Sequence, residues 1–192
     1  MKKETEIMEY LKQNLSKKRL KHSIGVSDTA RMLALHYGCD PDKAELAGLL
    51  HDCAREKTMA ELIQYVRAEG MEPDEMSLRM RELLHGPAAV YICRKTFNIN
   101  DEEELSAIRY HTIGKVNMTL LEKIIFLADY IEPSRDFKGV KKLRALAYSD
   151  LDGALLAAFD STIEYILAKK AYIHIDTIAA RNYLLLTMEK DS

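Results

Sequence analysis

Apolar residues recur every three or four positions along most of the chain, and glycine, proline and short polar residues fall between these runs. No stretch has the apolar/polar alternation and hairpin turns that are typical of β-strands. The pattern therefore predicts an all-α protein, and residues 1–192, without a flexible linker or repeat, are expected to form a single domain. The expected helices cover approximately residues 4–15, 17–37, 41–51, 58–69, 74–84, 87–97, 101–111, 119–132, 150–170 and 176–188.

The stretch LAGLLHDCA, residues 46–54, places alanine, leucine or glycine in nearly every helical direction, which predicts a buried central helix. His51 and Asp52 are neighbours at the end of this run. A buried imidazole and a buried carboxylate lose their hydration, at a cost of roughly several kcal/mol for an unpaired charge. Because neighbouring helical residues point about 100° apart, both side chains can reach one metal ion between them. The alternative is a core histidine hydrogen-bonded to an aspartate at a helix end.

A second apolar segment, KIIFLADYIEP at residues 123–133, carries Asp129 within a helix that is otherwise apolar on every side, and Pro133 ends this helix. His22 lies near the start of the helix expected over residues 17–37. Helices that face one another in a bundle core can bring such side chains to one metal. Two imidazoles and two carboxylates suit iron, manganese or zinc better than calcium or magnesium.

Charge and cysteine content exclude several classes of protein. Lys+Arg 28 against Asp+Glu 30 gives a formal charge of -2, so no global positive field indicates a nucleic-acid partner. Cys39, Cys53 and Cys93 form no CxxC motif and cannot all pair, which is typical of a reducing compartment. The charged N-terminal stretch does not resemble a signal peptide, and no run approaches the ~20 apolar residues of a membrane-spanning helix. We therefore expect a cytoplasmic protein with no membrane partner.

The order His22, His51-Asp52, Asp129 in a helical chain resembles the HD-domain metal-dependent phosphohydrolases. The similarity extends over nearly the whole chain to the bacterial HD-domain symmetrical diadenosine tetraphosphate hydrolases of the YqeK type. It is carried by HSIGVSDTARMLALHYGCD (22–40), AGLLHDCAREK (47–57), LLHGPAA (83–89), YHTIG (110–114), IIFLADYIEPSR (124–135) and AYIHIDTIAARNYL (171–184).

The resemblance implies an HD-domain helical bundle whose buried site holds iron, or alternatively manganese or another divalent transition metal. The implied metal ligands are His22, His51, Asp52 and Asp129. It also implies that a metal-activated hydroxide cleaves diadenosine tetraphosphate into two ADP, with Asp52, His85 and His111 as catalytic residues. The last two could bind a second metal bridged by Asp52, or donate protons to phosphate oxygens. Without the resemblance, a packed or helix-terminal imidazole would be the simpler interpretation.

Phosphate requires cations and hydrogen-bond donors, and Arg55, Lys57 and Arg135 each follow a proposed ligand by a few residues. Taken singly, each is better explained as a solvated charge, and Tyr172 could be a core residue. The resemblance assigns nucleotide contacts to Arg135 and to the segment 172–177. The full set of expected substrate-binding residues is His22, Arg55, Lys57, His85, His111, Asp129, Arg135, Tyr172, His174 and Thr177.

Two alternatives stay open beside this function. One is an HD-domain hydrolase of another nucleotide: a nucleoside monophosphate, a cyclic nucleotide or a guanosine polyphosphate. The other is a non-catalytic HD module that binds a nucleotide or a partner protein and uses metal only for folding, although a structural metal needs no extra imidazoles. The expected partner is a dinucleoside polyphosphate or a nucleotide such as ADP or a GDP-like product, and the sequence leaves open whether the chain forms a homodimer.

Overall fold

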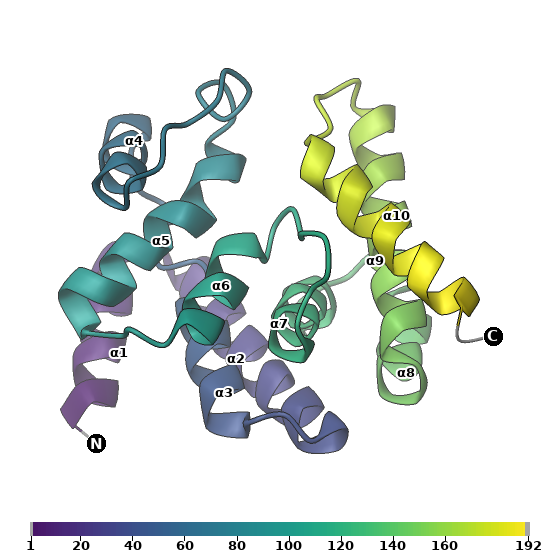
Figure 1. Cartoon of the computed structure of the whole chain (residues 1–192). Helices are drawn as coiled ribbons and strands as arrows, with labels where there is room; N and C mark the ends of the chain where they lie inside the picture. The colour runs from purple at the N-terminus through teal and green to yellow at the C-terminus, as the bar shows by residue number, and fades with distance from the viewer. Residues whose placement is uncertain (1, 191–192) are drawn as a thin grey trace.

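The computed structural model describes residues 2–190, and this part of the chain contains ten α-helices and no β-strand (Figure 1). The predicted all-α class is therefore confirmed. The helices are α1 Lys2–Asn14, α2 Lys17–Tyr37, α3 Pro41–Leu50, α4 Met59–Ala68, α5 Arg81–Phe97, α6 Glu102–Tyr110, α7 Leu120–Ile131, α8 Val140–Ser149, α9 Leu151–Ala168 and α10 Ile175–Lys190. Among these described helices, none is both long and apolar enough to cross a membrane.

Helix α7 is the central helix of the molecule. Thr119 and Glu122 form a capping box at its start, and every residue from Ile124 to Ala128 is buried. The helix packs against α2, α3, α6, α8 and α9, so apolar neighbours surround it as the sequence indicates. Asp129 follows directly after the buried run, and the fold thereby presents a carboxylate at the inner end of a core helix.

Helix α3 is shorter and less completely buried than predicted. It ends at Leu50, and Leu46 and Leu49 are only half-buried. The chain then continues in tight turns, in which the Cys53 amide donates to the Leu50 carbonyl at 3.0 Å. His51 and Asp52 therefore lie in the turn that follows the helix, and both are buried.

The expected helix over residues 74–84 and the expected break at His85-Gly86-Pro87 are both wrong. Residues 71–80 form turns and irregular structure, and α5 then runs without interruption through Pro87. Pro87 lies inside the helix, beyond its first turn, so the Leu83 carbonyl lacks the usual N–H donor four residues later. A Cβ atom at Gly86 would lie 2.6 Å from the backbone oxygen of Arg109, so this glycine allows α5 and α6 to approach closely. His85 consequently points into the core from within a helix.

Helix α8 was not predicted, and it orders the loop that follows α7. Leu143 and Ala147 bury its inner face. Arg144 donates hydrogen bonds to three backbone carbonyls of the preceding turn, those of Ile131, Glu132 and Arg135, at 2.7–2.8 Å. The loop that carries Arg135 is therefore held in place by α8.

Candidate metal centre

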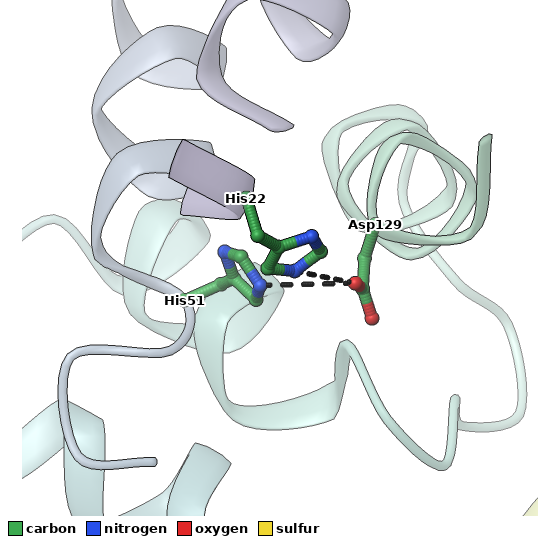
Figure 2. Close-up of side chains that lie close together, drawn as sticks. All are labelled: His22, His51 and Asp129. Carbon is green, nitrogen blue, oxygen red and sulfur yellow. Dashed lines mark ion pairs between the residues drawn. The ribbon is translucent and has the colours of Figure 1, made fainter. Parts of the chain in front are cut away.

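Three helices bring two histidines and an aspartate together at the centre of the fold (Figure 2). His22 comes from α2, His51 from the end of α3 and Asp129 from α7. The Asp129 Oδ1 atom lies 3.0 Å from His22 Nε2 and 3.9 Å from His51 Nε2. The predicted convergence of these three side chains is present in the structure.

Asp52 completes the predicted ligand set. Its Oδ2 atom lies 3.6 Å from His22 Nε2 and 3.4 Å from His51 Nε2. Both of these nitrogens are buried and have no hydrogen-bond partner within the described residues. An unsatisfied buried nitrogen is costly, and a cation between the four side chains would remove that cost. The mixed nitrogen and oxygen donors fit a divalent transition metal.

Hydrogen bonds behind the two imidazoles orient their Nε2 atoms toward this position. His22 Nδ1 donates to Glu132 Oε1 at 3.0 Å, and His51 Nδ1 donates to the Gly48 carbonyl at 2.6 Å. Because both partners are acceptors, each neutral ring carries its proton on Nδ1 and keeps a lone pair on Nε2. This is the usual arrangement of histidines that bind metal.

The carboxylates of the cluster are held in their ionised form. Burial alone would raise the pKa of Asp52, but the adjacent His51 imidazole and His85 hold it well below its usual value. Burial would likewise raise the pKa of Asp129, yet the adjacent His22 and His51 imidazoles and the charge of Arg135 keep it low. The cluster therefore offers two negative charges to a cation.

His85 and His111 lie on the other side of the Asp52 carboxylate. Asp52 Oδ1 is 3.1 Å from His85 Nε2 and 3.8 Å from His111 Nε2, and the two Nε2 atoms are 2.9 Å apart. The Thr112 hydroxyl lies 3.3 Å and 3.1 Å from the same two nitrogens. Asp52 thus contacts both histidine pairs.

The partners of Nδ1 distinguish these two histidines. His111 Nδ1 donates to the Ile108 carbonyl at 2.7 Å, which leaves a lone pair on its Nε2. His85 Nδ1 instead accepts from Arg55 Nη1 at 3.2 Å, because arginine has only donors. Neutral His85 therefore carries its proton on Nε2. Burial, with the nearby His51 and His85, lowers the pKa of His111 to about 3, so that its ring is neutral.

Two of the three predicted cations contact the cluster. Arg55 contacts His85, and Arg135 donates to both the backbone carbonyl and the carboxylate of Asp129. Lys57 does not join them: its ammonium group donates to Asn14 Oδ1 at 2.9 Å and lies over the Tyr10 ring. It therefore ties the loop after α3 to α1.

The segment 172–177 makes its contacts away from the ligand cluster. Tyr172 is 60% exposed and lines a hollow with Asp74 and Arg79, while the His174 ring lies 3.7 Å from the Asp74 carboxylate. Thr177 is buried at the start of α10. The nucleotide contacts expected of this segment thus stay a prediction from the resemblance.

Three further residues contact the cluster and were not predicted from the sequence. Arg19 Nη1 donates to Asp52 Oδ2 at 2.7 Å, Glu132 holds His22, and Thr112 contacts His85 and His111. Arg19 precedes His22 by one helical turn, and Glu132 follows Asp129 by the same interval. Residues three apart share a helix face, so this spacing from a predicted ligand is the signal that could have identified both.

Comparison with known protein families identifies the class of protein to which this chain belongs. Residues 19–134 match the family described as "HD domain", and this range contains all four proposed ligands together with His85 and His111. The chain therefore belongs to the HD-domain family.

Relatives that match nearly the full chain indicate the subgroup of the HD-domain family to which it is similar. Two of them are named "Bis(5'-nucleosyl)-tetraphosphatase, symmetrical". The protein from Halalkalibacterium halodurans is 45% identical, and the match covers 93% of this chain and 95% of the relative. The protein from Bacillus subtilis is 39% identical, and the match covers 94% of this chain and 96% of the relative. A crystal structure of a "predicted HD superfamily hydrolase involved in NAD metabolism" from Clostridium acetobutylicum shares 49% identity and a TM-score of 0.91, covering 94% of this chain and 96% of that one. The predicted resemblance to the bacterial HD-domain symmetrical hydrolases is confirmed.

Proposed function

We propose that the protein hydrolyses diadenosine tetraphosphate symmetrically, giving two ADP. The observation that carries the proposal is the convergence of His22, His51, Asp52 and Asp129 beside the facing pair His85 and His111. Similarity to the symmetrical tetraphosphatases over more than nine-tenths of the chain supports the choice of substrate. The same similarity argues against hydrolysis of a different nucleotide and against a purely structural metal.

The HD domain implies a divalent metal, and we assign iron to this site, with manganese or another divalent transition metal as the alternative. When bound, such a metal activates water near neutral pH and stabilises negative charge on phosphate. The four side chains named above would hold it. The proposed reaction requires no second metal, because neutral His85 carries a proton on Nε2 and can donate it to a phosphate oxygen.

His85 is placed to donate a proton or a hydrogen bond to a phosphate oxygen. Arg55 fixes the proton on His85 Nε2, and that atom faces the same Asp52 carboxylate that faces the proposed metal position. His111 keeps a lone pair on Nε2 and accepts from His85 when no substrate is present. Arg135 adds a planar donor beside Asp129, and its remaining N–H groups suit phosphate oxygens.

A cavity beside these residues fits the nucleoside of the half that is attacked. It has a volume of about 440 Å³, within the ~300–1,000 Å³ typical of small-molecule sites. His111, Asp129 and Arg135 line it next to the metal centre. The rest of the lining consists of four aromatic side chains and three hydroxyl-bearing residues, Thr112, Ser161 and Thr162. We call this the aromatic cavity, and its aromatic residues are Phe126, Tyr130, Phe137 and Tyr165. Aromatic faces stack well on a purine base.

Metal analysis combined with product chromatography tests the proposal. Purified protein reconstituted with iron or manganese should bind the metal and convert diadenosine tetraphosphate into ADP alone. His22→Ala should lose both properties. His36→Ala is the matched control, because His36 is an exposed histidine of the same helix and should leave both unchanged.

Three outcomes would contradict the proposal. AMP plus ATP would show asymmetric cleavage. Turnover of only monophosphates, cyclic nucleotides or guanosine polyphosphates would favour the other hydrolase classes. Metal binding without turnover of diadenosine tetraphosphate or of any of these other nucleotides would favour a non-catalytic module.

A further inference from the structure

A second cavity reaches the metal centre from the side of His22. It has a volume of about 470 Å³ and shares Arg135 and Phe137 with the aromatic cavity. We call it the polar cavity; its lining includes Ser16, Lys18, Arg19, His22, Ser134 and Arg135. The proposed metal ligands thus lie where two separate cavities of similar size meet, since His22 lines one and Asp129 the other.

The polar cavity carries cations that are suited to phosphate. Arg19 and Arg135 each use part of their guanidinium group on a ligand carboxylate, Asp52 and Asp129 respectively. A guanidinium group has five N–H donors, so both arginines keep donors for a further anion. Lys18 is exposed, and its ammonium group makes no ion pair within residues 2–190. Three acidic residues also line the cavity: Glu56 is hydrogen-bonded to Ser16, Glu132 is hydrogen-bonded to His22 and Ser134, and Asp136 is exposed.

Diadenosine tetraphosphate, the substrate of the proposed function, consists of two identical ADP arms that share one bridging oxygen. Symmetrical hydrolysis cleaves one of the two P–O bonds of that oxygen. A site that holds one arm in the aromatic cavity must also place the other arm on the far side of the reacting phosphorus. We propose that the polar cavity is the subsite of the departing ADP, with its phosphates on Lys18 and Arg19. This inference rests on the proposed function, which it extends to the second half of the substrate.

The chemistry of the leaving group favours this assignment. When the bond between the attacked phosphorus and the bridging oxygen breaks, the electron pair stays on that oxygen. The departing ADP therefore gains negative charge on its β-phosphate, and Arg19 and Lys18 are positioned to stabilise it. Among the described residues, Phe137 is the only large aromatic side chain that lines the polar cavity. The base of the departing half is therefore held less firmly than the base in the aromatic cavity.

Equilibrium dialysis of labelled ADP against the full-length, metal-loaded protein tests the second subsite. The wild-type chain should bind two ADP. Lys18→Glu should weaken one of the two sites by at least about tenfold, the effect of one charge-assisted contact with phosphate, and leave the other unchanged. Tyr165→Ala should weaken the other site, because Tyr165 lines only the aromatic cavity. With diadenosine tetraphosphate, Lys18→Glu should lower kcat/KM by a similar factor.

Lys17→Glu is the matched control. Lys17 is the neighbouring exposed lysine at the start of α2, and it does not line the polar cavity. This variant should keep both ADP sites. A single ADP site in the wild type, or a Lys18→Glu variant that matches Lys17→Glu in ADP affinity, would overturn the proposal. Absence of diadenosine tetraphosphate cleavage would instead refute the proposed function, because ADP stoichiometry is measured without turnover.

Discussion

His85 Nε2 and His111 Nε2 lie 2.9 Å apart, and the groups that contact the two Nδ1 atoms give the rings opposite hydrogen-bonding roles. Arg55 donates to His85 Nδ1, whereas His111 Nδ1 donates to a backbone carbonyl. The pair therefore consists of one donor and one acceptor at Nε2. A ring whose Nε2 is protonated does not bind metal through that atom, which separates His85 from the four proposed ligands.

His85→Ala should lower turnover strongly and leave one tightly bound metal ion per chain. Loss of a general acid or phosphate donor typically costs about 10²–10⁴-fold in rate. Metal content measured by atomic emission and kcat measured on diadenosine tetraphosphate would test both parts. A variant that loses all of its metal would show that His85 belongs to the ligand set.

Asp52→Ala should abolish both metal retention and activity. The residue removed is the carboxylate that contacts His22 and His51 through Oδ2 and His85 through Oδ1. Asp28→Ala offers the control, since Asp28 is an exposed carboxylate on α2 and should change neither quantity. Normal metal content and turnover in Asp52→Ala would refute the proposed site.

Glu132→Gln should weaken metal binding without unfolding the protein. The carboxylate accepts from His22 Nδ1 and from the Ser134 amide, and such a partner behind a ligating histidine is typically worth about 10–100-fold in metal affinity. Competition with a calibrated chelator measures that affinity, and circular dichroism checks the fold. Unchanged affinity would mean that the hydrogen bond does not tune the His22 ligand.

Local signals predicted much of the fold and the candidate site. Polar side chains in apolar helices marked His51, Asp52 and Asp129, because burial of such groups requires a compensating partner. The capping box of Thr119 and Glu122 depends only on residues three apart, so local sequence is sufficient to specify this helix start. Arg19 and Glu132 were not predicted. Each lies three residues from a predicted ligand, but the side chains that they contact, Asp52 and His22, come from other parts of the fold.

The sequence His85-Gly86-Pro87 was misinterpreted for the same reason. Glycine and proline usually interrupt helices, so the local pattern predicted a break. In the structure, the missing side chain of Gly86 is used for the close approach of α5 to the backbone of α6. That tertiary contact outweighs the local preference, and it also sets the separation of His85 and His111.

Gly86→Ala should therefore destabilise the protein. In an isolated helix this change would stabilise by about 1 kcal/mol, but the added Cβ would meet the Arg109 carbonyl at 2.6 Å. Overpacking of this kind typically costs about 1–3 kcal/mol, so the free energy of unfolding in urea should fall. Lys95→Ala, an exposed site on the same helix, should change that free energy by no more than about 0.5 kcal/mol. Increased stability in Gly86→Ala would show that the helices can separate freely.

The position of cleavage gives the last prediction. The attacking oxygen must approach in line with the leaving oxygen, so the placement of the substrate decides which phosphorus is attacked. If Arg135 and the aromatic cavity hold one complete ADP half beside the ligand cluster, attack falls on the β-phosphorus of that half. The other half then leaves as ADP with its bridging oxygen retained.

Hydrolysis in water labelled with heavy oxygen should consequently give two ADP molecules, of which only one carries the label, on its β-phosphate. Mass spectrometry of the products after a single turnover measures this distribution, and ADP incubated with the enzyme in the same water controls for later exchange. Because the substrate is symmetrical, half of the ADP pool should be labelled whichever arm enters the aromatic cavity. Label in AMP or ATP as main initial products would place the attack on a different phosphorus, and the proposed seating of the ADP half would then be wrong even in an active enzyme.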